Sequence, residues 1–228
     1  LAALMGTPVK FIWTHDAFRV GEDGPTHEPV EQEAQIRLLE KLQNHKGQDS
    51  LRVFRPADAE ETTVCWAMAM ENMETPTALI FSRQNIAELP AGNDYEQARK
   101  GAYVVAGSDD PFDVILLASG SEVSTLEAGK ELLEKDGVRC RVVSAPSEGL
   151  FRRQSKEYQE SVLPTGSKIF GMTAGLPVTL EGLVGIGPNS RIFGMKSFGF
   201  SAPYKVLDEK LGFTAENVYK QVKDFLGK

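Results

Sequence analysis

The strongest constraint on the fold is a regular alternation of short apolar runs with longer helix-like segments. Continuous apolar runs of strand length occur at 9–14 (VKFIWT), 51–55 (LRVFR) and 77–82 (TALIFS), as expected of strands that are buried in a sheet. The segments between these runs have the length and composition of helices. Because strands that alternate with helices form parallel sheets, the first part of the chain is predicted to be an α/β unit.

A second alternating series follows a polar stretch. Residues 84–100 contain Pro90 and Gly92 and show no strong apolar period, so we predict a domain boundary there. Beyond it, AYVVAG, DVILLAS and VRCRVVS have the pattern of strands, and EVSTLEAGKELLEKDG and AENVYKQVKDFLGK that of helices. The sequence therefore predicts two α/β domains with mainly parallel sheets, at 1–85 and 101–228, with a linker at 86–100.

Composition narrows the possible partners. The 228 residues carry a formal net charge of -7, whereas nucleic-acid binding needs a basic surface that replaces counterions on phosphate. No apolar stretch approaches the roughly 18 residues that cross a bilayer. We therefore expect no nucleic-acid partner, no membrane partner and a cytoplasmic location. The cysteines, Cys65 and Cys140, lie in apolar runs without metal or redox spacing, so we expect reduced core thiols.

The first residues read as the end of a helix. LAALM is followed by Gly6 in the position of a helix cap and by Pro8 just beyond it. We therefore expect the sequence to begin inside an element and to be a fragment of a longer protein.

Candidate functional residues gather where predicted strands end. His15 follows the first strand and Arg83 the third, while the loop GEDGPTHEPVEQ carries Asp23 and His27. Because the carboxyl ends of parallel strands share one edge, these residues are expected to line one cleft. Each also has an ordinary structural explanation: a turn for the loop, a surface ion pair for Arg83 and a core position for His15. Together, an arginine fork and imidazoles suit an anionic substrate.

Several motifs together closely resemble the C-terminal portion of transketolases. In chain order they are THDAFRVGEDGPTHEPVEQ, FRPADAEET, PTALIFSRQN, ASGSEV and FGFSAP with LGFTAENV, and GEDGPTH together with SRQN is the most specific pair. The resemblance runs from near residue 1 to residue 228. It implies the latter part of the pyrimidine-binding domain of a thiamine diphosphate enzyme, followed by a transketolase C-terminal domain.

The resemblance also implies a role for each candidate residue. His15 and Arg83 match residues that bind the substrate phosphate. Asp23 matches an aspartate that hydrogen-bonds the C2 hydroxyl of the acceptor aldose. His27 matches a histidine close to the cofactor and the ketol oxygen, which donates a hydrogen bond or shuttles a proton. His27 is thus predicted to be both catalytic and cofactor-binding.

The same resemblance implies cofactors and partners of the parent protein. Transketolases use thiamine diphosphate and a divalent cation, Mg or Ca, in a cytoplasmic homodimer of the pentose phosphate pathway. They move a two-carbon ketol unit between sugar phosphates such as xylulose 5-phosphate, ribose 5-phosphate and erythrose 4-phosphate. The family's catalytic glutamate and its metal and diphosphate site would lie upstream of Leu1, so we expect no catalysis by this chain alone.

Other functions stay open at this point. The chain could be a non-catalytic structural or assembly module, a small-molecule-binding module of a thiamine diphosphate enzyme, or one subunit of a split enzyme. ASGSEV could bind an anion at a helix N-terminus, but it lacks nucleotide-binding spacing and a structural role is favoured. FGFSAP and the terminal helix are expected to serve packing and subunit contact.

The sequence departs from the family pattern near these motifs. Residues 17–19 are Ala-Phe-Arg where Ser-Ile-Gly is usual, Glu28 stands where Gln is common, and Thr173 stands where the family usually has Glu. Arg19 and Glu28 would flank the site and adjust its charge, and Thr173 puts in doubt any role assigned to that glutamate.

Overall fold

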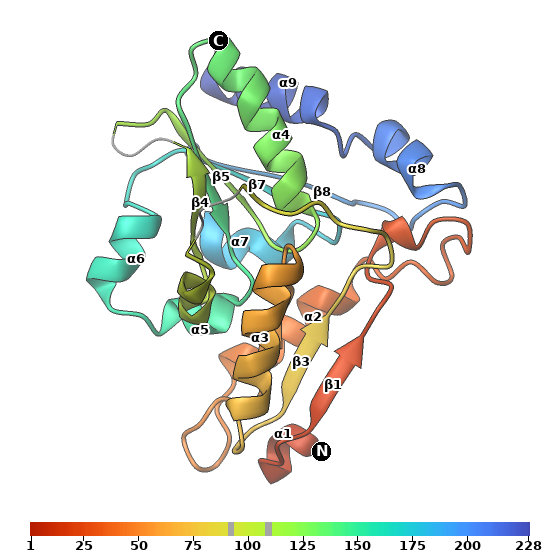
Figure 1. Ribbon diagram of the computed structural model, residues 1–228, viewed down its shortest axis with the longest axis vertical. Helices are drawn as coiled ribbons and strands as arrows, with labels where there is room; N and C mark the ends of the chain where they lie inside the picture. The colour runs from red at the N-terminus through yellow and green to blue at the C-terminus, as the bar shows by residue number, and fades with distance from the viewer. Residues whose placement is uncertain (91–93, 108–110) are drawn as a thin grey trace.

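A computed structural model describes residues 1–90, 94–107 and 111–228 (Figure 1). Gly92 of the predicted linker lies outside these ranges. Within them, no helix is both long enough and apolar enough to cross a membrane. The strands are Lys10–Trp13 (β1), Arg52–Phe54 (β2), Thr77–Ile80 (β3), Tyr103–Gly107 (β4), Val114–Ala118 (β5), Cys140–Ser144 (β6), Ile169–Thr173 (β7) and Ser190–Gly194 (β8). The helices are Ala2–Met5 (α1), Gln32–Leu38 (α2), Ala59–Glu71 (α3), Glu122–Lys135 (α4), Glu148–Arg152 (α5), Lys156–Val162 (α6), Val178–Val184 (α7), Tyr204–Leu211 (α8) and Ala215–Leu226 (α9), with 3-10 turns at Phe18–Val20 (η1), Leu39–Lys41 (η2) and Tyr95–Lys100 (η3).

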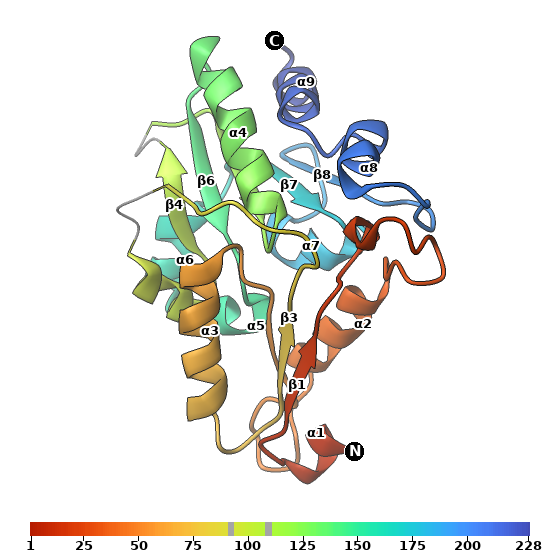
Figure 2. The same ribbon diagram turned by 45° about the vertical axis from the view of Figure 1, so that its right-hand side comes forward.

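The described strands form two sheets. The smaller has the order β1-β3-β2 and is parallel throughout. The larger has the order β4-β6-β5-β7-β8 and is parallel except for β4, which runs antiparallel to β6. In Figures 1 and 2 the smaller sheet occupies the lower half with the amino terminus, and the larger sheet occupies the upper half with the carboxyl terminus. The predicted α/β fold with mainly parallel sheets is confirmed.

Both faces of the larger sheet are covered, which explains why β5 reads as an unbroken apolar run. Leu116 belongs to the core cluster that includes residues of α4 and α9, whereas Ile115 and Leu117 belong to the cluster that includes residues of α5 and α7. Successive strand side chains point to opposite faces, so a strand with helices on both sides needs an apolar residue at every position.

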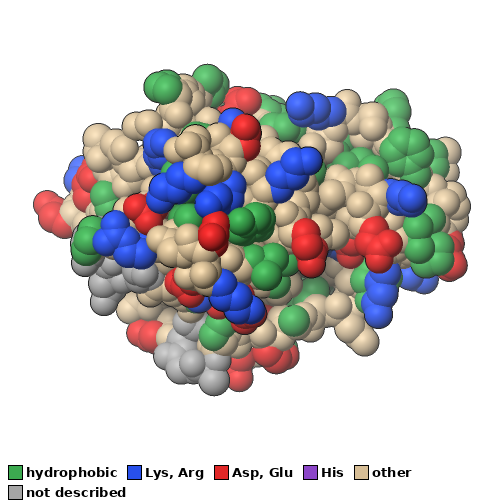
Figure 3. Space-filling model, turned by 90° about the horizontal axis from the view of Figure 1, so that it is seen from above, with side chains coloured by type: hydrophobic (Ala, Val, Ile, Leu, Met, Phe, Trp, Pro, Cys, Tyr) green, Lys and Arg blue, Asp and Glu red, His purple; other side chains and the backbone are tan. Residues whose placement is uncertain are grey.

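Helices α4 and α9 lie side by side on one face of this sheet (Figures 1 and 2). Their close approach depends on Gly129, because a Cβ there would lie 2.5 Å from Val218 Cγ1. Asp136 at the end of α4 pairs with Lys223 of α9 at 2.5 Å. On the face seen in Figure 3, acidic, basic and apolar side chains are interspersed, so that face carries mixed charge.

Helix α3 packs on the smaller sheet, and Asp58 is its N-cap. The Asp58 carboxylate accepts a hydrogen bond of 2.8 Å from the Glu61 amide, which satisfies one of the free donors of the first turn. Cys65 of α3 is a buried free thiol, as is Cys140 of β6, as the sequence predicts. Strand β1 lies at the edge of this sheet, and its Trp13 is 42% exposed.

The sequence analysis did not identify every element. It predicted the strands β1 to β6 to within about two residues at each end, together with α1, α2, α3, α4 and α9. It did not identify the short helices α5, α6, α7 and α8, nor the antiparallel direction of β4. These helices have five to eight residues, too few turns for a clear apolar period.

Candidate functional site

A groove of about 1020 Å³ lies between the loops that follow β1 and the segment that follows β8. Both candidate histidines line it, so the structure brings His15 and His27 together as the sequence predicts. The strands β1 and β3 are neighbours and parallel, which also confirms that their carboxyl ends share one edge. The groove is lined by Thr14, His15, Pro25, Thr26, His27, Glu28, Pro29, Glu31, Gln32, Ser197, Phe198, Gly199 and Phe200.

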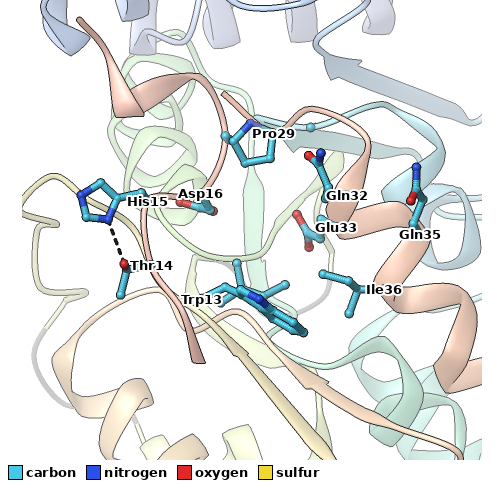
Figure 4. Close-up of a pocket in the computed structure, with 12 residues that line it drawn as sticks. Trp13, Thr14, His15, Asp16, Pro29, Gln32, Glu33, Gln35 and Ile36 are labelled. Carbon is cyan, nitrogen blue, oxygen red and sulfur yellow. Dashed lines mark hydrogen bonds between the residues drawn. The ribbon is translucent and has the colours of Figure 1, made fainter. Parts of the chain in front are cut away.

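His15 is held in an unusual backbone conformation. Its φ is +66° and that of Ala17 is +54°, a region that residues other than glycine rarely adopt. The His15 Nδ1 atom lies 2.8 Å from the Thr14 hydroxyl. Figure 4 shows the His15 ring on the Thr14 side of this turn, whereas Asp16 points the other way, toward Glu33. The turn therefore separates an exposed imidazole from a carboxylate that points inward.

His27 ends a tight loop shaped by glycines. Gly21 and Gly24 have φ values of +90° and +78°, which glycine adopts without steric cost. The His27 amide donates a hydrogen bond of 3.0 Å to the Gly24 carbonyl, and its Nδ1 atom lies 2.9 Å from the Thr26 hydroxyl. In both histidines the hydrogen bond to the preceding threonine engages Nδ1, which leaves Nε2 as the ring atom for a ligand.

Asp23 and Arg83 are exposed, and neither lines the groove. Asp23 lies in the same loop as His27, four residues before it. Arg83 lies two residues beyond Phe81, whose amide and carbonyl still follow the register of β1 and β3 through bonds to Trp13 and Asp16. Arg83 thus follows β3 at the sheet edge that carries the groove, and Asp23 lies in the loop that ends at His27. The expectation that all four candidates line one cleft is therefore met by His15 and His27 and not by Asp23 and Arg83.

Glu28 is a buried carboxylate next to His27. Its side chain lies against Gly199, and only 3% of the residue is exposed. Neither carboxylate oxygen has a hydrogen-bond partner with good geometry among the described residues. Burial raises the pKa of Glu28, and the backbone of Phe200 and Gly21 partly opposes this rise. Burial thus disfavours the charged form of this carboxyl group relative to a carboxyl group in water.

Two aromatic residues that the sequence analysis assigned to packing form one wall of the groove. Phe198 and Phe200 remain 72% and 54% exposed and line the groove together with the histidines. The sequence FGFSAP places these two rings next to Gly and Pro, in a loop and not in a helix or strand, which is a sign of an exposed aromatic site.

A buried set of charges lies beneath the groove. Arg55 Nε lies 2.5 Å from Asp16 Oδ2, and Arg55 Nη1 lies 2.6 Å from Glu122 Oε2. Arg19 also pairs with Glu122 and with Asp208, the latter at 2.7 Å. Burial alone would raise the pKa of Glu122, but the two arginines hold it below its usual range.

This arrangement corrects one expectation and decides another. Arg19 does not adjust the charge of the groove, because its guanidinium is buried and neutralised by Glu122 and Asp208. The ASGSEV turn does not hold an anion, because the guanidinium of Arg55 fills the space over Gly120 and donates to the Ser119 carbonyl. The turn therefore has a structural role and binds a cation of the chain itself.

The donors around the groove define what it can bind. The lining includes the imidazoles of His15 and His27 and the hydroxyls of two threonines, which can form hydrogen bonds with a polar organic molecule. The rings of Phe198 and Phe200 add apolar surface. A hard divalent cation needs several oxygen ligands, and in the described ranges no cluster of three or more His, Cys, Asp or Glu is placed to hold a metal ion. The polar groups of the groove therefore fit a polar organic molecule.

A second cavity of about 330 Å³ adjoins the groove and shares Thr14, His15, Pro29 and Gln32 with it (Figure 4). Its other walls include Trp13 and Ile36. The cavity therefore combines an apolar floor with a polar rim.

Comparison with known proteins decides the family. Residues 1–88 match the family model described as the transketolase pyrimidine binding domain, and residues 101–214 match the transketolase-like C-terminal domain. The chain belongs to the transketolase family. It is 43% identical over 232 residues to the transketolase of Halalkalibacterium halodurans, covering 99% of this chain and 33% of that one.

Solved transketolases have the same fold. The transketolase from Leishmania mexicana superposes with a TM-score of 0.86 at 36% identity and covers 99% of this chain and 31% of that one. A transketolase mutant from Pichia stipitis in complex with xylulose 5-phosphate gives a TM-score of 0.85 at 34% identity, with 99% and 31% covered. The chain thus spans about a third of the length of the transketolases it matches.

Proposed function

We propose that this chain supplies the acceptor side of a transketolase site, in an enzyme that transfers a two-carbon ketol unit from a ketose phosphate to an aldose phosphate. The observation that carries the proposal is the groove in which His15 and His27 present their Nε2 atoms at the carboxyl edge of the smaller sheet. Open α/β sheets bind ligands at this edge. Family membership and the sugar phosphate bound to the Pichia stipitis relative support the substrate class.

Each candidate residue has a role in this proposal. Arg83 and His15 bind the phosphate of the sugar, for which a guanidinium fork and an imidazole are suitable donors. Asp23 accepts a hydrogen bond from the C2 hydroxyl of the acceptor, and its exposed place in the loop that ends at His27 supports a contact with the incoming aldose. His27 donates a hydrogen bond to the oxygen of the transferred ketol unit and carries a proton as that unit forms or leaves.

The cofactor of the proposed enzyme is thiamine diphosphate with a divalent cation, Mg or Ca. When bound, thiamine diphosphate supplies the carbanion chemistry of the transfer. The residues of this chain bind and orient the sugar around it, and the apolar rings of Phe198 and Phe200 exclude water from that side of the groove. The described residues hold no cluster of three or more His, Cys, Asp or Glu that could bind the metal ion, so we place the metal and diphosphate ligands on the rest of the proposed enzyme.

The proposal extends to organisation and context. We place the latter part of the pyrimidine-binding domain at 1–85, a linker at 86–100 and the C-terminal domain at 101–228. The match to the pyrimidine binding domain ends at residue 88 and the match to the C-terminal domain covers 101–214, which supports a boundary in this region. The enzyme would act as a cytoplasmic homodimer of the pentose phosphate pathway, with xylulose 5-phosphate, ribose 5-phosphate and erythrose 4-phosphate as substrates.

A replacement experiment tests the function. The matching last third of the Halalkalibacterium halodurans transketolase is exchanged for this chain, and ketol transfer from xylulose 5-phosphate to ribose 5-phosphate is measured with thiamine diphosphate and magnesium. The chain alone and the truncated relative alone serve as controls. Transfer by the chimera only is the expected result. A folded chimera without transfer would contradict the proposal and favour a binding or assembly module, and transfer by the chain alone would contradict the division of the site.

A further inference from the structure

Glu122 is a buried carboxylate shared by two arginines of the first half of the chain. It is the first residue of α4 and is fully buried. Arg55 Nη1 lies 2.6 Å from its Oε2 atom, Arg19 Nη1 donates to its Oε1 atom, and the Ala174 amide donates to Oε2 at 3.2 Å. The carboxylate therefore joins α4 and the segment after β7 to η1 and to the segment after β2.

The first of these connections leads to His15. Arg55 follows β2, and its Nε atom lies 2.5 Å from Asp16 Oδ2. Asp16 stands between His15 and Ala17, the described non-glycine residues with positive φ. Such backbone strain persists only where surrounding contacts enforce it. Because the Asp16 side chain is held by a buried guanidinium, the ion pair keeps the turn in the conformation that directs the His15 ring into the groove.

The second connection leads to His27. Arg19 lies in η1, directly before the loop 21–27, and its Nε atom lies 2.7 Å from Asp208 Oδ1 of α8. Its guanidinium carbon also lies 5.6 Å from the centroid of the Phe213 ring, within the range of a cation–π contact. The start of the loop is thus held by both α4 and α8, which restricts the motion of the loop 21–27.

We propose that Glu122, Arg55 and Arg19 are positioning residues for the groove, through which the C-terminal half sets the placement of His15 and His27. The inference rests on the proposed function of the groove. None of the three side chains lines it, so they act through Asp16 and the loop. Buried ion pairs contribute little to stability compared with apolar residues of the same size, whereas they fix direction closely. Placement within fractions of an ångström is what a reacting site requires.

Arg19→Lys is the main test variant, with Glu122→Gln as the second. A lysine keeps the charge, but one ammonium group cannot reproduce a guanidinium fork that contacts Glu122 and Asp208 together. Glu122→Gln removes the charge that two buried guanidiniums share and carries a greater risk of unfolding. Arg141→Lys is the matched control. Arg141 is also buried, but it lies near the amino-terminal end of β6 and donates to the carbonyls of Ser161 and Val162.

The first readout is amide hydrogen exchange of this chain, followed by mass spectrometry. Exchange in peptides that cover 14–30 is expected to rise about tenfold in Arg19→Lys, because the segment opens locally, while β5 and β7 keep their protection. Arg141→Lys leaves exchange in 14–30 unchanged. Unaltered exchange of 14–30 in a folded Arg19→Lys protein would overturn the proposal.

The second readout is catalysis by the chimera described above. In Arg19→Lys the kcat is expected to fall about tenfold or more with a smaller change in KM, since misplacing a reacting group lowers the rate of the chemical step. Looser exchange with an unchanged kcat would overturn the positioning role. An inactive chimera that carries this chain unaltered would instead overturn the proposed function, and the exchange rates, which need no catalysis, still decide whether the segment is held.

Discussion

The Ser201 hydroxyl donates a hydrogen bond of 2.7 Å to the Glu22 carbonyl, so the segment after β8 holds the loop that carries Asp23 and His27. The Ala202 amide adds a longer bond of 3.4 Å to the Gly21 carbonyl. A loop that is held at its carbonyls keeps its side chains free for a ligand. The contact also explains why the two halves of the chain enclose one groove rather than two separate surfaces.

The role proposed for His27 predicts a loss of turnover without a loss of fold. In the chimera, His27→Ala removes a group that donates to the ketol oxygen, so kcat should fall by about a hundredfold or more, as for other general acid–base groups. His45→Ala is the matched control, because His45 is exposed in the loop between η2 and β2. The measurement is steady-state ketol transfer, with circular dichroism to check folding. Normal turnover in a folded His27→Ala enzyme would remove the role.

The sequence predicted that His15 and His27 lie in one groove, because the position of each histidine depends on local sequence patterns. A strand that ends at Trp13 and a loop with Gly21 and Gly24 place the histidines at one sheet edge whatever the rest of the chain does. Parallel pairing of β1 with β3 then brings Arg83 to the same edge. These inferences need only periodicity and turn chemistry.

What the sequence could not predict is the contact between the halves. Arg55 and Glu122 are 67 residues apart. Nothing in the sequence around either residue shows that the Arg55 guanidinium fills the turn just before Glu122. The same holds for Arg19, which looks like a charge beside the loop and is in fact neutralised by Asp208 and Glu122. Tertiary ion pairs of this kind leave no periodic signal.

The role proposed for Arg83 predicts a substrate-dependent effect. Arg83→Ala should raise KM for phosphorylated acceptors by roughly tenfold or more, the size expected for a lost hydrogen bond to a charged group. The KM for an unphosphorylated aldehyde such as glycolaldehyde should change little. Arg139→Ala is the control, since Arg139 is half-exposed and pairs with Asp113 before β5. Equal changes for both acceptors would show that Arg83 does not read the phosphate.

The role proposed for Asp23 predicts discrimination at one hydroxyl. Asp23→Ala should lower kcat/KM for ribose 5-phosphate by roughly tenfold, and it should barely affect 2-deoxyribose 5-phosphate, which never makes the contact. Glu22→Ala is the control, because Glu22 is its exposed neighbour and its contact to Ser201 uses the backbone. If the two acceptors lose activity in parallel, Asp23 acts on the loop and not on the hydroxyl.

Glu61 predicts a pH dependence of stability that is independent of the groove. Its carboxylate is fully buried and accepts hydrogen bonds of 2.6 Å from the Ala57 amide and the Ser144 hydroxyl. Burial raises the pKa of Glu61 to about 7. Because the native state holds this proton more tightly than the unfolded state, the contribution is fully present below the unfolded pKa near 4.5 and is lost as the pH rises through about 7.

Urea unfolding at several pH values measures this contribution. The free energy of unfolding should fall by about 2 kcal/mol between about pH 5.5 and pH 8 on account of Glu61, since each unit of pKa difference corresponds to about 1.4 kcal/mol. Glu61→Gln cannot titrate and should lose this part of the slope, even if the amide, with one acceptor instead of two, lowers stability at every pH. Glu60→Gln alters the exposed neighbour and should keep the slope. The same slope in Glu61→Gln and in the unaltered chain would show that Glu61 stays charged in the native state.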